Sequence, residues 1–269
     1  MRDLFSGYIV QMLCSVGVIA AFGLIIHLLR RSFCALTGYA GYKILLISGA
    51  VGTPVHELSH ALMCIIFGHK ITEIKLYDPN SNDGTLGHVC HTYQRRNLYH
   101  QIGNFFIGAA PVILGGGFIL LLLYILLPET FSTVSADIIF INSSSTSLPI
   151  SDYLAFIWKT VGALFSPDNL ASLNGWLFII LALMIASHTE MSPADIKGGL
   201  GGLGLIALLM LLIDLVLCFI FPKAFFTVTD AFKSFALILS AFLSLSIIFL
   251  LSMLLVALIV RIIKMIIAR

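Results

Sequence analysis

Long apolar runs constrain the fold of this chain more than any other feature. A hydrocarbon layer of about 30 Å needs some 20 apolar residues in a helix that rises about 1.5 Å per residue. Five runs are long enough for this: 8–29, 44–67, 102–127, 199–221 and 234–260. A sixth, shorter run at 175–187 would cover only roughly 20 Å, so we expect a half-length helix there that turns within the membrane. The sequence therefore predicts an all-α polytopic membrane protein with about six transmembrane helices, one of them broken or half-length.

The composition supports a membrane class and argues against other classes. The chain is 59% hydrophobic and only 10% charged, whereas soluble domains are about 25% charged. The formal net charge of +2 is small, and the basic residues are scattered, which argues against a nucleic-acid partner. The five cysteines are odd in number and three lie in apolar runs, so they do not predict a disulfide framework.

The apolar runs also suggest how the chain is organised. We expect a single domain over 1–269 with a core at 44–221, an external loop at 128–174 and peripheral helices at 8–29 and 234–260. With six spans both termini lie on one side, and most of the Lys and Arg residues fall on that side, which predicts that it is cytoplasmic. The pair Arg30-Arg31, directly after the first run, opposes this orientation.

One motif carries chemistry: His56-Glu57-Leu58-Ser59-His60. Histidines four apart on a helix project from one face and can reach one metal ion, while Glu57 lies beside them to accept a proton from water. With eight histidines in the chain, the chance of this spacing arising anywhere is about 0.003 by simple counting. Two imidazoles and a carboxylate inside an apolar helix are costly unless they have partners, so the pattern favours a functional metal site.

A third metal ligand must come from another part of the chain, because hydrolytic zinc takes three protein ligands and leaves a position for water. The histidine pair is expected about 10–16 Å from the cytoplasmic end of its helix, and the half-length run ends roughly 10 Å from the same face. The polar turn at 188–199 should therefore meet the pair. Asp214 is expected roughly 28 Å further along the next helix, paired with a neighbouring polar group. The candidates are Asp195, His188, Glu190 and Asp214, and we favour Asp195.

Three segments together resemble the site-2 protease family of intramembrane metalloproteases. They are Gly52-Thr-Pro-Val-His56-Glu57-Leu-Ser-His60-Ala-Leu, Gly108-Ala-Ala-Pro111 and Ser192-Pro-Ala-Asp195-Ile-Lys-Gly198, and the resemblance covers most of 44–215. It implies that HExxH in one membrane helix and an aspartate in a second complete a zinc site. The family aspartate is commonly followed by glycine, whereas Ile-Lys follows Asp195, and His188 stands about where the family often has asparagine.

A β-hairpin is predicted after the HExxH helix. Residues 70–77 and 85–93 read as two strands around the turn at Asp83-Gly84. The resemblance implies an edge strand that holds an extended substrate, and a plain surface hairpin is an equal alternative. Asn104 is interpreted either as an oxyanion donor or as a cap of the next span. Nearby histidines are interpreted as surface residues: His69, His88, His91 and His100.

These features predict an intramembrane zinc endopeptidase that cleaves membrane-embedded or membrane-proximal polypeptides. One Zn²⁺ per chain is expected on His56, His60 and Asp195, with Glu57 as general base. We expect the active site toward the cytoplasmic side of a bacterial cell membrane. A CAAX-processing or heat-shock type of membrane endopeptidase would instead use Glu190 as third ligand, and a metal-binding scaffold or transporter would not depend on Glu57.

Overall fold

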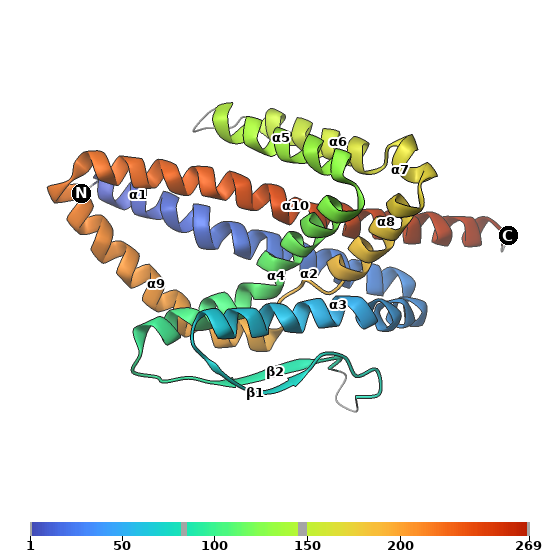
Figure 1. The fold of residues 1–269 in the computed structure, drawn as a ribbon, viewed down its shortest axis with the longest axis horizontal. Helices are drawn as coiled ribbons and strands as arrows, with labels where there is room; N and C mark the ends of the chain where they lie inside the picture. Colours follow the sequence, from blue (N-terminus) through green and yellow to red (C-terminus); the bar gives the residue numbers. More distant parts are fainter. Residues whose placement is uncertain (1, 82–84, 145–149, 268–269) are drawn as a thin grey trace.

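A computed structural model describes residues 2–81, 85–144 and 150–267, most of which are helical (Figure 1). A two-stranded sheet of β1 (Lys70–Lys75) and β2 (His88–Thr92) lies between the third and fourth α-helices. The helices of the described ranges are α1 (Arg2–Met12), the π-helical η1 (Leu13–Gly17), α2 (Val18–Thr37), α3 (Tyr39–Ile66), α4 (Leu98–Leu126), α5 (Pro128–Ser144), α6 (Ile150–Leu164), α7 (Pro167–Ala171), α8 (Leu173–Ala186), α9 (Pro193–Ile220) and α10 (Pro222–Ile267).

Four helical stretches in the described part of the chain are long and apolar enough to cross a membrane. They are the continuous stretch Arg2–Thr37, α4, α9 and α10. The predicted span at 44–67 corresponds to α3, which is not among them, because the polar HExxH residues lower its hydropathy. Helix α8 has 14 residues, which agrees with the predicted half-length helix. The helical membrane class therefore holds, and the count of six spans stays a prediction.

Several boundaries differ from those expected. The turn after α8 ends earlier than predicted, because α9 begins at Pro193 instead of at 199. The predicted external loop at 128–174 is built largely from α5, α6 and α7. Helix α10 is 46 residues long, or roughly 69 Å at the usual rise, about twice what a bilayer core requires.

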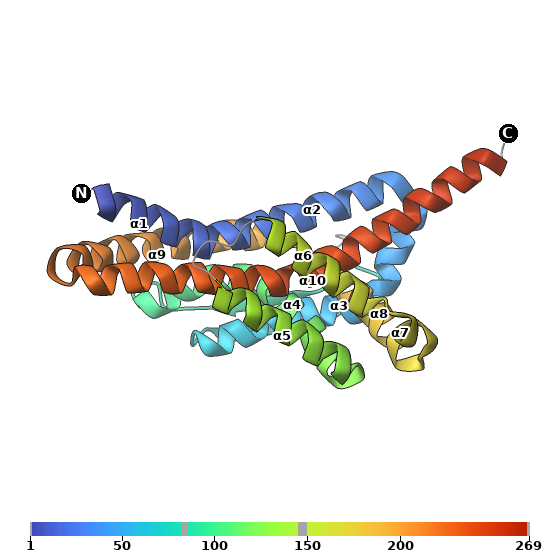
Figure 2. The same cartoon turned by 90° about the horizontal axis from the view of Figure 1, so that it is seen from above.

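Helix α4 holds the fold together, packing against α3, α8, α9 and α10 (Figures 1 and 2). Glycines permit the close approaches. A methyl group at Gly108 would lie 2.4 Å from the Asp195 carbonyl oxygen of α9, and one at Gly116 would lie 2.9 Å from the Phe242 carbonyl oxygen of α10. The Gly108-Ala-Ala-Pro111 segment is therefore a packing surface that brings the start of α9 against α4.

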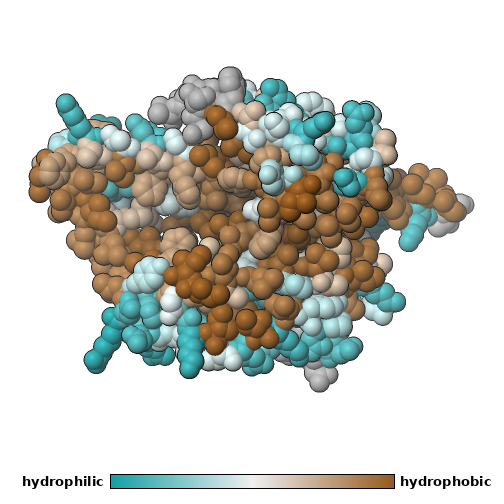
Figure 3. Space-filling model, in the orientation of Figure 1, coloured by the Kyte–Doolittle hydropathy of each residue, from teal (hydrophilic) through white to brown (hydrophobic). Residues whose placement is uncertain are grey.

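The outer surface suits a lipid environment. Figure 3 shows apolar residues in a broad band across the middle of the face drawn, with hydrophilic residues gathered above it, over α5 to α7, and below it, over the hairpin. Helix α9 contributes large exposed apolar side chains, including Leu208 at 52% and Phe219 at 61% exposure. An exposed apolar surface of this extent is typical of proteins that lie in a membrane.

A buried polar cluster ties three of the helices together away from the HExxH motif. The Gln11 side chain of α1 donates to Asp214 Oδ1 of α9 and to Thr229 Oγ1 of α10, both at 3.0 Å. Asp214 is therefore paired with a neighbouring polar group, as expected.

The hairpin begins where Gly68 ends α3. Its φ of +68° is the left-handed conformation that glycine adopts at a helix C-terminus. The turn brings the His69 N–H within 2.8 Å of the Cys64 carbonyl oxygen, to which it donates. The strands pair antiparallel with a register irregularity between Ile71 and Glu73. The predicted hairpin is confirmed with shorter strands, and its expected turn at Asp83-Gly84 lies outside the described residues.

Candidate metal centre

The rings of His56 and His60 point toward each other because a hydrogen bond to a backbone carbonyl oxygen orients each of them. His56 Nδ1 donates to the carbonyl oxygen of His188, and His60 Nδ1 donates to that of Ile107, both at 2.7 Å. A carbonyl can only accept, so both Nδ1 atoms carry hydrogen and each neutral ring presents its Nε2 lone pair. The two Nε2 atoms are 3.1 Å apart. Metal-binding histidines are commonly oriented by such hydrogen bonds.

Asp195 faces the same point from the first turn of α9. Its Oδ1 lies 3.4 Å from His60 Nε2, and its Oδ2 lies 4.0 Å from His56 Nε2. A capping box with Ser192 fixes the carboxylate: Ser192 N donates to Asp195 Oδ2 at 2.7 Å, and Asp195 N donates to Ser192 Oγ at 3.1 Å. Pro193 at the first helical position favours this helix start.

The donor set fits a zinc-like ion. Ligands 2.0–2.1 Å from a tetrahedral zinc would be about 3.4 Å from one another, close to the separations of 3.1, 3.4 and 4.0 Å between the atoms here. Two nitrogen lone pairs and a carboxylate that face one another repel unless a cation lies between them. The residues present therefore suit a divalent cation with a two-imidazole, one-carboxylate ligand set.

Glu57 lies beside this group and lines the same cavity. The cavity has a volume of about 390 Å³ and is bordered by the ligand group, the segment 85–89 and His91. Glu57 is buried, with 5% exposure, and makes no hydrogen bond or ion pair with the residues that the structure describes. The segment 85–89 passes close to the Glu57 side chain, since a methyl group at Gly87 would lie 2.9 Å from Glu57 Cγ. Glu57 is thus free to interact with a molecule in the cavity.

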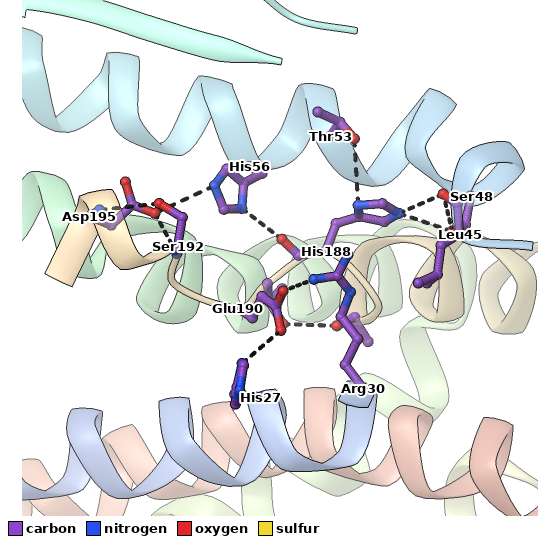
Figure 4. A network of polar contacts seen from close by, with 12 residues as sticks. His27, Arg30, Leu45, Ser48, Thr53, His56, His188, Glu190, Ser192 and Asp195 are labelled. Atoms are coloured by element: carbon purple, nitrogen blue, oxygen red, sulfur yellow. Dashed lines mark hydrogen bonds and ion pairs between the residues drawn. The ribbon is translucent and has the colours of Figure 1, made fainter. Parts of the chain in front are cut away.

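The other two candidate ligands in the turn have different partners (Figure 4). The His188 ring makes its contacts on the far side from Asp195, with Nε2 3.0 Å from Ser48 Oγ and 3.1 Å from the Leu45 carbonyl oxygen. Glu190 is ion-paired with Arg30 and lies 3.4 Å from His27 Nδ1. The His188 carbonyl oxygen therefore orients the His56 ring. Neither the His188 side chain nor the Glu190 side chain belongs to the ligand group.

In the sequence, Arg30 only opposes the predicted membrane orientation. The helix continues through it, because α1, η1 and α2 form one stretch from Arg2 to Thr37, and its side chain borders the cavity and pairs with Glu190. Its charge thus has a partner inside the protein. For this reason Arg30 is a poor indicator of which side of the membrane its helix end lies on.

Asn104 does not cap α4 in the described structure. The N-cap of α4 is Asn97, whose Oδ1 accepts from Tyr99 N at 2.9 Å, and Asn104 lies within the helix. It is also not among the residues that border the cavity. The expectation of a cap is wrong because the helix begins before the apolar run does.

The histidines near the hairpin are not all on the surface, contrary to the sequence interpretation. His69 is 5% exposed, and its Nδ1 lies 3.0 Å from His91 Nδ1. Burial is the main cause that lowers the pKa of His69 and also that of His91, and both residues lie outside the membrane-spanning helices. The fold at Gly68, which turns the chain back under α3, buries His69.

The chain was also compared with known proteins. No protein-family model, no curated protein and no solved structure matches it.

Proposed function

We propose that this chain is a membrane zinc endopeptidase that hydrolyses peptide bonds of membrane-embedded or membrane-proximal polypeptides. The observation that carries the proposal is the convergence of His56, His60 and Asp195 from α3 and α9 on one point, beside Glu57, which has no hydrogen-bond or ion-pair partner among the described residues. The sequence resemblance to site-2 proteases points to the same ligands.

Each residue has a role that follows from its contacts. His56, His60 and Asp195 would hold the ion, which when bound would polarise a peptide carbonyl and lower the pKa of a water molecule. Glu57 accepts the proton of the attacking water and returns it to the leaving amine, because it borders the cavity and has no other partner in the described ranges of the chain. The carbonyls of Ile107 and His188 keep both imidazoles in the tautomer that presents Nε2.

The geometry favours this assignment over its two alternatives. A third ligand at Glu190, which the CAAX-processing and heat-shock types would require, would first have to leave Arg30 and His27. A scaffold or transporter would need the metal ligands and would have no use for Glu57. The buried position of Glu57 beside the ligand group therefore favours catalysis.

The test separates metal binding from catalysis. In detergent-purified protein, Glu57→Gln should keep its zinc and lose peptide hydrolysis by at least about a hundredfold. Asp195→Ala should lose the zinc of this centre, whereas Glu190→Gln should retain it. Full activity in Glu57→Gln would eliminate the protease assignment, and retention of this zinc in Asp195→Ala would eliminate the ligand set.

A further inference from the structure

A second group of metal-ligand side chains lies where the hairpin leaves α3. Cys64 in the last turn of α3 is completely buried, and His69 just after Gly68 is 5% exposed. His91 reaches them from β2, opposite Ile71 in the strand register. One ligand atom from each of these three residues lies within 4.8 Å of the other two.

We propose that Cys64, His69 and His91 form a second metal site, which holds a zinc-like divalent ion and fixes the hairpin to the end of α3.

The orientation of His69 supports this assignment. Its Nε2 donates to the His100 carbonyl oxygen at 2.9 Å, so the neutral ring presents the Nδ1 lone pair toward His91. The two Nδ1 atoms are 3.0 Å apart, close to the roughly 3.4 Å expected for two imidazoles on one tetrahedral zinc. Ring stacking on Tyr93, with centroids 4.9 Å apart, also holds His69 in place.

The ligand chemistry indicates which kind of ion is expected. One thiolate with two imidazoles is a borderline-soft donor set that suits Zn²⁺, in contrast to the oxygen ligands that Mg²⁺ and Ca²⁺ prefer. A third group of metal-ligand side chains lies on the hairpin and consists of Glu73, His88 and Cys90. It does not support the same inference, because the Glu73 side chain is 63% exposed.

The proposed site has a structural consequence for the cavity. The three ligands come from the end of α3, from the link to β1 and from β2, so one ion would join all three. His91 also borders the 390 Å³ cavity that contains Glu57. Metal at this site would therefore hold the strand beside the cavity in place, and it does so whether or not the first centre is catalytic.

Cobalt spectroscopy can distinguish the two sites, because only the second contains sulfur. The full chain is purified in detergent, stripped of metal and titrated with Co²⁺ alone. We expect a near-ultraviolet thiolate-to-cobalt absorption band that Asp195→Ala retains and Cys64→Ser lacks. Bound cobalt should fall from about two ions to about one per chain in either variant, each losing one site.

Matched controls make the result decisive. Cys218→Ser changes a cysteine in α9, and Cys90→Ser changes the exposed neighbour of His91, and both should keep the band. His91→Ala removes a half-buried ligand and should weaken cobalt binding at this site by at least about tenfold, which provides a test if Cys64→Ser fails to fold. A missing band in the unaltered chain, or a band that depends on Cys90, would overturn the proposal and leave a hydrogen bond from His91 to His69 as the explanation.

Discussion

Replacing Gly108 with alanine should disrupt the metal centre without touching any ligand. The new methyl group would lie 2.4 Å from the Asp195 carbonyl oxygen, whereas ordinary contacts begin at 3.4 Å. The obstacle is helix backbone, so α4 and the start of α9 must separate by roughly 1 Å. A displacement of about 1 Å at a reacting centre reduces rates by about a hundredfold.

The effect on the metal centre should exceed the effect on stability. Overpacking by one methyl group destabilises a protein by about 1–3 kcal/mol, and the gain in helix propensity from glycine to alanine offsets about 0.5–1 kcal/mol of that. We therefore expect folded protein with zinc affinity at the Asp195 centre at least about tenfold weaker and with peptide hydrolysis about a hundredfold slower.

Metal analysis, a cleavage assay and a parallel control test this reasoning. Gly117→Ala adds a methyl group to the same helix where nothing lies within 4 Å, so it should keep both zinc and activity. Wild-type zinc content and cleavage in Gly108→Ala would show that the close approach of α4 and α9 does not position Asp195.

Two further substitutions probe how the helices are held. Ser192→Ala removes the side-chain half of the capping box of α9 and leaves the backbone bond to the Asp195 carboxylate, which should destabilise the chain by about 1 kcal/mol and weaken zinc binding several-fold; unchanged zinc affinity by competition titration would show that the Ser192 side-chain cap does not help to hold Asp195. Gln11→Ala removes the donor to Asp214 and Thr229, which should lower stability by about 1–3 kcal/mol and reduce the melting temperature in detergent. Gln101→Ala, which removes a solvent-exposed hydrogen bond to the Arg95 carbonyl oxygen, is the control, and equal melting temperatures for the two glutamine variants would contradict the buried-network account.

Local patterns predicted the parts of the site that depend on local structure. Helical periodicity placed His56 and His60 on one face, and rise per residue placed Asp195 near them in depth. The start of α9 was also readable, because Ser192-Pro193 followed by Asp195 has the residues of a capping box with proline at the first helical position. The turn was predicted to extend to 199 because Gly198 and Gly199 were interpreted as part of it.

Other features could not be read from residue identity. The carbonyls of Ile107 and His188 orient the imidazoles, and every residue has such a carbonyl, so the sequence carries no mark of their role. The sequence presents Arg30 only as a charge at a helix end. Its pairing with Glu190 joins residues that are far apart in the chain, so residue identity does not indicate it. Burial of His69 likewise depends on the reversal at Gly68, which places it under the end of α3.

The order of the ligands along the chain has a consequence for biosynthesis. During translation His56 and His60 emerge well before Asp195, and the carbonyl of His188 that orients His56 also arrives late. A ribosome-bound chain that ends within α8 therefore has two imidazoles and lacks the carboxylate. We expect metal capture at this centre to follow the insertion of α9, so that the proposed hydrolytic activity begins only after α9 is in place.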